Sequence, residues 1–314
     1  MEIINNSTEN SLEAREYSFN IISQMCLNNK LAQKEFRRKG GIEILKKNLN
    51  YQSIMDQIGN QKIYVLVVLD CLWNAVIGNK RNEEQFIELD GLFTLFEILE
   101  QSDEIHSKTI LSCIASLVDN KRSFSYFIQW KSNNSNSNID ATKLLIAIYR
   151  DEDRKYGVEY ENGILKNFNG RPLNPKTSYK IRKLEKAKSD ESERRMKKTK
   201  KNNRESLFSV SDKDSNKSKS TVNGYENDGN IYRSEDFIDS YLNHKISEIT
   251  KFFDLRETIF SIFYRVGFNN ISISTSEDKQ TFVMIKMYPV FKNLENWKDV
   301  VEELEEMVKI FFNF

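Results

Sequence analysis

The sequence repeats a pattern of residues at an offset of 50. Each copy contains an Asn-Lys pair, a phenylalanine, a glycine and three aliphatic residues at the same spacing. The first copy comprises Asn29, Lys30, Phe36, Gly41, Ile42, Leu45 and Leu49, and the second comprises Asn79, Lys80, Phe86, Gly91, Leu92, Leu95 and Leu99. Because the spacing is kept, we expect successive helical units that lie side by side and share one continuous apolar core.

A third and less regular copy follows the second. Asn120 and Phe127 each lie 41 residues after their counterparts, and Leu144 and Leu145 end the unit after a polar insertion. Two helices, a glycine and a third helix, repeated every roughly 40 to 50 residues, are typical of armadillo and HEAT repeats. We therefore predict an all-α protein with armadillo/HEAT-like helical repeats. Such repeats are surfaces that hold other proteins.

The composition favours helices and argues against several classes of protein. Only 3 Pro and 11 Gly occur among 314 residues, and Lys+Arg 47 against Asp+Glu 46 gives a formal net charge of +1. No overall charge therefore attracts nucleic acid or an acidic membrane. The 3 cysteines form no CxxC pair, the N-terminus lacks a secretory signal, and the most apolar run, 63–69, is too short to span a bilayer. We expect a cytoplasmic protein.

Apolar residues recur at helical spacing along the first half of the chain. In residues 11–28, Phe19, Ile22, Met25 and Cys26 are expected to form the buried face of an amphipathic helix. Residues 63–77 are apolar on nearly every side and should form the most deeply buried helix. Further helices are predicted at 32–38, 103–120 and 141–149, with a turn at Gly40-Gly41 and a loop at 131–138.

The composition changes near residue 151. Polar residues with hardly any apolar pairs follow Pro175, and Ser, Asn, Asp and Lys dominate from the basic run at 194–204 to Gly229, which is typical of disorder. Helical spacing returns near Ser234. We predict armadillo-like repeats at 11–150, a disordered basic linker at 151–230 and a C-terminal helical domain at 231–314. The exposed ends of the repeats are expected to be capped by the C-terminal helices or by another protein.

The C-terminal domain contains clear helix signals. An apolar stripe at 234–253 predicts one helix, and Asp254 is placed to cap a second helix that ends at Gly267, with Phe263 and Tyr264 inside. A last helix is predicted at 294–312. Its apolar face would comprise Trp297, Val300, Val301, Leu304, Met307 and Val308.

One stretch of this domain fits two structures. Residues 271–275 and 281–287 are rich in β-branched and aromatic residues and could pair as a β-hairpin. The acidic residues after Thr275 instead resemble the first turn of a helix that ends at Pro289. We favour the helix.

Two stretches resemble the family of cilia- and flagella-associated protein 69. Residues 65–80 (VLVVLDCLWNAVIGNK), followed by 88–93, look like an armadillo unit of that family. Residues 255–268 and 276–297 are similar to its C-terminal helices, whereas the linker between is unmatched. The resemblance implies a helical scaffold of the motile-cilium axoneme, within the central apparatus. Members are far longer, so this chain would correspond to the later part. The family provides no ligand-binding residue to carry over.

The sequence contains no catalytic or cofactor signature. His106 and His244 lie in different regions without metal-type companions, and neither a GxxxxGK[ST] nor a GxGxxG motif occurs. Asp70, within an apolar helix, is expected to face a groove or cap a neighbouring helix. Trp73 and Asn74 are adjacent and occur once, unlike the repeated Trp and Asn ladders of peptide-binding armadillo proteins. We therefore expect neither an enzyme nor a cofactor.

A basic run at 194–204 leaves several interpretations open: a solvated linker, a contact with an acidic partner such as tubulin tails, nuclear targeting, or nucleic-acid contact. Few aromatic residues accompany it, so no nucleic acid is expected. The candidate contacts for an acidic partner are Arg194, Arg195, Lys197, Lys198, Lys200 and Lys201. At the chain end, Phe311, Phe312 and Phe314 are expected to dock onto a partner or onto the repeats.

The repeats predict a scaffold that packs against other proteins, and the family resemblance implies that these are axonemal proteins of a multi-protein complex that contributes to ciliary motility. The rival hypothesis is an armadillo-type regulatory or transport adaptor that binds peptides in the cytoplasm or nucleus. That rival requires a groove with regularly spaced Asn residues, which the sequence lacks.

Overall fold

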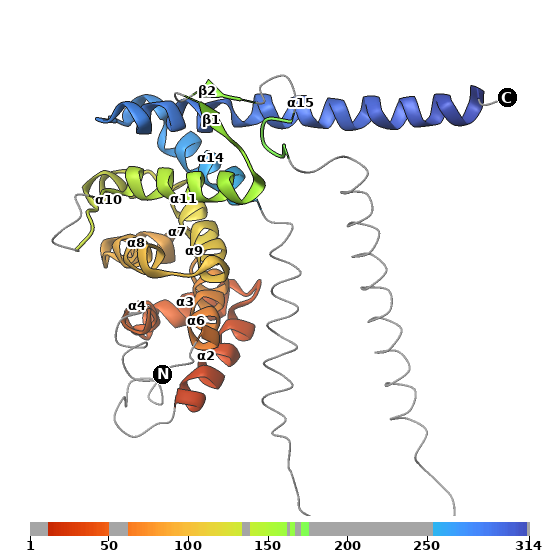
Figure 1. Cartoon of the computed structure of the whole chain (residues 1–314). Helices are drawn as coiled ribbons and strands as arrows, with labels where there is room; N and C mark the ends of the chain where they lie inside the picture. Colours follow the sequence, from red (N-terminus) through yellow and green to blue (C-terminus); the bar gives the residue numbers. More distant parts are fainter. Residues whose placement is uncertain are drawn as a thin grey trace, which may run out of the picture.

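The repeated sequence pattern folds into stacked three-helix units. The computed structural model describes residues 12–49, 62–133, 139–161, 164–166, 171–175 and 254–312. Its units follow one another in a single stack (Figure 1). The first contains α2 (Leu12–Cys26), α3 (Lys30–Arg38) and α4 (Gly41–Asn48), the second α6 (Lys62–Ala75), α7 (Lys80–Glu88) and α8 (Gly91–Gln101), and the third α9 (Glu104–Leu117), α10 (Ser123–Gln129) and α11 (Ala141–Tyr156). The predicted all-α repeat fold is confirmed.

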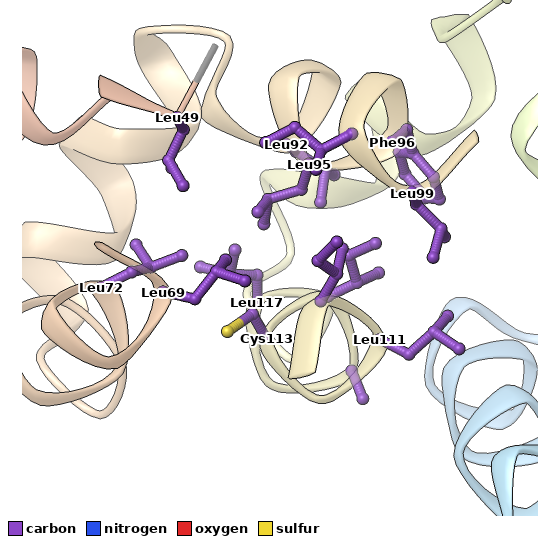
Figure 2. Close-up of a cluster of buried hydrophobic side chains, with 14 of the residues drawn as sticks. Leu49, Leu69, Leu72, Leu92, Leu95, Phe96, Leu99, Leu111, Cys113 and Leu117 are labelled. Carbon is purple, nitrogen blue, oxygen red and sulfur yellow. The ribbon is translucent and has the colours of Figure 1, made fainter. Parts of the chain in front are cut away.

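The units share one apolar core. The opening helices pack in sequence, α2 against α6 and α6 against α9, while α8 also packs against α9. Figure 2 shows side chains of successive units that point into this common space. They include Leu49, Leu69, Leu72, Leu92, Leu95, Phe96, Leu99, Leu111, Cys113 and Leu117, all buried.

The spacing of five residues between phenylalanine and glycine, which recurs in both units, has a steric cause. A Cβ atom on Gly41 would lie 2.5 Å from the Phe36 ring, and one on Gly91 would lie 2.5 Å from the Phe86 ring. Only a glycine lets the helix start approach the ring so closely. The two glycines therefore occupy equivalent corners of their units. The preceding residues, Gly40 and Asp90, both have a left-handed backbone, with φ of 72° and 60°.

Buried polar side chains fix how the first two units stack. Asn82 is fully buried and donates to the carbonyls of Gln33 at 3.0 Å and Ala75 at 2.7 Å. Arg37 donates to its Oδ1 at 2.9 Å, and the Gln33 amide donates to the Asn74 carbonyl at 2.9 Å. These groups reach their partners only when the two units stack in this register. Another register would leave them buried and unpaired, which is costly, so the hydrogen bonds favour this one.

Burial differs from the sequence prediction in two helices. Met25 is exposed, and Ser23 takes its place beside Phe19 and Cys26 on the buried face of α2. The helix at 63–77 is not the most deeply buried, because Asp70 in α6 is exposed and α9 buries a larger share of its residues.

A fourth, atypical unit closes the stack. Its first helix, α14 (Leu255–Val266), packs against α9 and α11, and the short η1 (Phe268–Asn270) leads to α15 (Ser276–Phe312). Asp254 caps α14, Gly267 follows its end, and Phe263 is buried as predicted, but Tyr264 is exposed. The core of the repeats continues into α14, so the C-terminal helices cap this end of the stack as expected, whereas apolar residues of α2 stay exposed at the other end. Residues 231–253 lie outside the described residues.

Helix α15 is longer than the sequence suggests. The Thr275 hydroxyl accepts from the Asp278 backbone N–H at 3.1 Å and caps the helix, so the hairpin interpretation of 271–287 is wrong. Pro289 does not end the helix either, and the separate helix at 294–312 is part of α15. Burial of Ile285 and Phe291 on either side of the proline outweighs the hydrogen bond that proline cannot donate.

The expected boundary at residue 151 is wrong. Helix α11 continues to Tyr156 and ends at Gly157, whose φ is 76°. A short antiparallel hairpin of β1 (Tyr160–Glu161) and β2 (Ile164–Leu165) follows. Buried Leu165 and Leu173 then pack with Tyr288 of α15. Composition misled the prediction because few apolar residues are needed to anchor this segment.

Candidate interaction surfaces

The cysteines contribute packing rather than reactivity. Cys26, Cys71 and Cys113 are all buried and unpaired. Burial raises the pKa of each thiol, that of Cys113 to about 12. The thiolate is the nucleophilic form, so these protonated thiols are poorly suited to catalysis at neutral pH.

The buried histidine belongs to a helix start. His106 lies in the first turn of α9, and its Nδ1 is 2.5 Å from Oδ1 of Asp103, which also caps the helix. Within the described ranges, no group of three or more His, Cys, Asp or Glu side chains is arranged to hold a metal ion. None of the described helices combines the length and apolar character that crossing a membrane requires.

A cluster of buried polar groups lies between α11, α14 and α15, centred on Arg256. The guanidinium group is fully buried. Its Nη1 donates to Oδ1 of Asp153 at 3.0 Å and to the carbonyl of Leu173 at 2.8 Å, while Nε donates to Oδ1 of Asp254 at 3.0 Å. The ring of Tyr156 lies 4.2 Å from the guanidinium carbon. This arrangement supplies the partners that a buried cation requires.

A second group of contacts holds residues 171–175 against α15. Glu295 is buried and accepts from the backbone N–H groups of Leu173 at 2.6 Å and Asn174 at 2.8 Å. Arg171 donates to Asp299 at 2.6 Å and to Glu302 at 2.7 Å. Because Arg256 also contacts Leu173, this segment is clamped between α14 and α15.

The pKa shifts around Arg256 follow from burial and pairing. Burial raises the pKa of Asp153, although Arg256 and the hydroxyl of Tyr160 oppose the rise. Burial would lower the pKa of Arg256, but its bonds to Asp254 and Asp153 outweigh this and raise it. Perturbed groups can mark an active site, yet here each faces fixed protein partners. We interpret the cluster as a structural clamp.

Exposed apolar residues lie on α2, the helix at the N-terminal end of the stack (Figure 1). They extend to the start of α3, on the side away from α6. These residues, which we name the N-terminal face, are Tyr17, Ile21, Met25, Leu27 and Leu31, and between 48% and 76% of each is exposed. Tyr17, Ile21 and Met25 are spaced by four residues, so they form one ridge along the helix.

Asp70 links two units. It lies on the exposed side of α6 and accepts a hydrogen bond from the hydroxyl of Ser23 in α2. Asn74 donates to the same hydroxyl at 2.8 Å. The amide of Asn74 is thus engaged within the stack, and Trp73 beside it is partly exposed. This arrangement does not resemble a peptide-binding ladder.

A second exposed apolar surface follows the length of α15. Its members, which we name the outer stripe, are Val283, Met287, Val290, Leu294, Trp297, Val301, Leu304 and Val308. All are exposed except Leu294, which is half-buried, and Trp297 is the most exposed at 69%. The predicted apolar face of the last helix therefore exists, but in the described structure it faces solvent.

The site residues chosen from the sequence are mostly not reached by the structure. The basic run and Phe314 lie outside the described residues. Phe311 and Phe312 extend the backbone of α15, and their side chains are not described. The sequence reasoning missed the N-terminal face, although the four-residue spacing of its apolar residues was visible. It also missed Arg256, since nothing local indicates that its partner is Asp153.

Comparison with known proteins gives consistent matches. The family model "Cilia- and flagella-associated protein 69, ARM repeat" matches residues 2–251. The match includes the segment at 151–230, which the sequence resemblance had left unmatched, and it ends before α14.

Curated relatives carry the same name. Cilia- and flagella-associated protein 69 of Mus musculus is 25% identical over 150 residues, which are 48% of this chain and 16% of the relative. The protein of Homo sapiens is 20% identical over 286 residues, 91% of this chain and 24% of the relative, and that of Papio anubis gives the same values. The chain thus spans about a quarter or less of these relatives.

Proposed function

Since this chain belongs to the armadillo-repeat family of cilia- and flagella-associated protein 69, we propose that it is a non-enzymatic scaffold of the motile-cilium axoneme. We place it in the central apparatus, where it would contribute to motility as part of a multi-protein complex. The observation that carries the proposal is the N-terminal face, a group of exposed apolar residues at one end of the stack. A surface of this kind marks a protein-binding site.

The proposed mechanism is helix packing. Tyr17, Ile21 and Met25 form a ridge of the kind that enters a groove between side chains of a facing helix. Leu31, the most exposed of the face at 76%, lies beside it. A few such anchors supply most of the affinity of an interface, whereas the surrounding contacts exclude water. A helical axonemal protein is therefore the partner that this face fits.

The test uses two double variants of α2 in the full chain. Ile21→Lys/Met25→Lys places two charges on the ridge, and Asn20→Lys/Gln24→Lys places the same charges on exposed positions beside it. Endogenously tagged protein is followed in the cilium and in axonemes washed with increasing salt. We expect wild type and control to remain bound while the ridge variant is released. Absence of the wild-type protein from cilia, or equal retention of both variants, would refute the proposal.

A second contact is proposed at the basic run, with the acidic tails of tubulin as its partner. Support comes from the charge: the stretch 194–204 contains seven basic residues and no acidic one. Microtubule co-sedimentation should weaken when the six candidate residues are replaced by glutamine, and also when the tubulin tails are removed by subtilisin. Binding that withstands both changes would exclude this contact.

A further inference from the structure

The outer stripe of α15 has the periodicity of a coiled coil. Its eight residues from Val283 to Val308 are separated alternately by four and three positions. This is the a and d pattern of four consecutive heptads, which is enough to indicate a coiled coil. The stripe is about 39 Å long, since it covers 26 residues of helix. A helix face that contacts only water does not require apolar residues at regular spacing, whereas packing against a second helix does.

The opposite side of α15 is already used by the stack. Thr281, Ile285, Tyr288 and Glu295 are buried and alternate by the same spacing of four, three and seven residues. Thr281 accepts a hydrogen bond from Arg150 of α11, Tyr288 packs with Leu165 and Leu173, and Glu295 accepts from the clamped segment 171–175. Figure 1 shows the stacked units on one side of α15, and the C-terminal end of the helix extends past them. A partner helix on the outer stripe would therefore not compete with the fold.

The order of side chains along the stripe indicates which partner fits. Read from the two ends toward the middle, the residues pair as Val283 with Val308, Met287 with Leu304, Val290 with Val301 and Leu294 with Trp297. Every pair joins an a with a d position, as antiparallel two-helix packing requires. The layers alternate between two small and two large side chains. The stripe thus complements a second copy of itself in the reversed direction.

Charge favours the same orientation. The segment 294–309 carries six acidic residues and two lysines, a net charge of −4, whereas 276–293 carries two acidic residues and three lysines, a net charge of +1. Parallel helices would place the two acidic segments side by side. Antiparallel helices place each acidic segment beside the slightly basic segment of the other chain, which avoids this repulsion.

We infer that two copies of this chain associate through the outer stripes of α15 as an antiparallel, two-fold symmetric pair. The interface is isologous, because residue 287 of one copy meets residue 304 of the other and the reverse. The pair would carry its two stacks on outward-facing sides and so present two N-terminal faces. This inference is independent of the proposed ciliary role, since it concerns only self-association.

The first experiment measures the molar mass of the full chain by sedimentation equilibrium. We expect twice 37.0 kDa for the wild type. Leu304→Glu should raise the dimer dissociation constant by roughly a hundredfold or more, because each dimer would bury two unpaired carboxylates. The control Asn296→Glu adds the same charge at an exposed position off the stripe and should remain dimeric. A single-chain mass for the wild type at all concentrations up to roughly 100 μM would overturn the inference.

The second experiment tests orientation with a short thiol-specific crosslinker. The variant Met287→Cys/Leu304→Cys should form covalent dimers, whereas Leu304→Cys alone should not. The native cysteines are buried and do not compete. Crosslinking of Leu304→Cys alone would show a parallel pair and would overturn the inferred arrangement. Circular dichroism melting of each variant checks that the exposed substitutions leave the fold intact.

Discussion

Replacement of Gly91 by alanine tests the steric origin of the 50-residue repeat. The new Cβ would lie 2.5 Å from ring atoms of Phe86, which is fully buried. Ordinary contacts of this kind are about 3.5 to 4 Å, so the ring must move by about 1 Å inside a packed core. Such overpacking costs about 1–3 kcal/mol.

The helix propensity of alanine offsets part of this cost. Alanine gains about 0.5–1 kcal/mol over glycine within a helix, and Gly91 is the first residue of α8, where the gain is smaller. We therefore expect Gly91→Ala to lower the free energy of unfolding by about 1–2 kcal/mol. Urea titration followed by circular dichroism measures this change. Gly41→Ala, against Phe36, should behave in the same way.

A double-mutant cycle isolates the contact with the ring. Phe86→Leu alone is destabilising because it leaves a cavity. Combined with Gly91→Ala it should cost at least about 1 kcal/mol less than the sum of the single changes, since the clashing ring atoms are gone. Gly78→Ala is the control, because its Cβ would meet nothing within 4 Å and only its φ of 77° is strained. Additive energies in the Gly91 cycle, or a neutral Gly91→Ala, would refute the steric explanation.

Three further predictions concern buried groups. Arg256→Met should lower the free energy of unfolding, measured by urea titration, by about 3–5 kcal/mol, because Asp153 and Asp254 lose their buried cation. A loss of unfolding free energy no larger than that of a surface substitution would contradict the clamp. Asn82→Ala should cost about 1–3 kcal/mol by the same assay, since it leaves the carbonyls and the guanidinium at the unit junction without their partner, and a neutral result would argue against a fixed register. The buried thiols of Cys26, Cys71 and Cys113 should not react with a disulfide reagent at mildly alkaline pH until urea unfolds the chain. Rapid reaction of the folded protein would contradict their burial.

The parts of the fold that the sequence predicts well are those set by neighbouring residues. Asp254 caps α14 through its own side chain, and Gly267 ends the helix within the same segment. The paired phenylalanine and glycine of each unit likewise lie five residues apart. Such signals need no knowledge of the rest of the chain, so the repeat and the helix ends that these residues set can be inferred from spacing alone.

The features that escaped prediction depend on distant partners. Arg256 is paired with Asp153, 103 residues earlier, and Glu295 holds Leu173, 122 residues earlier. No local pattern distinguishes these side chains from solvated ones. Pro289 predicts a helix end because its ring is unfavourable in a helix interior, yet packing across α15 keeps the helix continuous. For the outer stripe, the spacing correctly predicted an apolar face but could not indicate that the face stays uncovered.

The two ends of the stack differ in a way that bears on function. At the C-terminal end, α14 continues the row of opening helices, and the buried cluster of Arg256 with Asp153 fixes it to α11. At the N-terminal end, α2 carries exposed apolar residues on the side where a further helix would pack. A helical stack exposes apolar surface at an end that lacks a polar terminal unit. The C-terminal end of the repeats is covered by α14 and α15, whereas no described helix covers the exposed side of α2. We therefore expect loss of binding to follow changes at the N-terminal face, whereas changes in the clamp should act through stability.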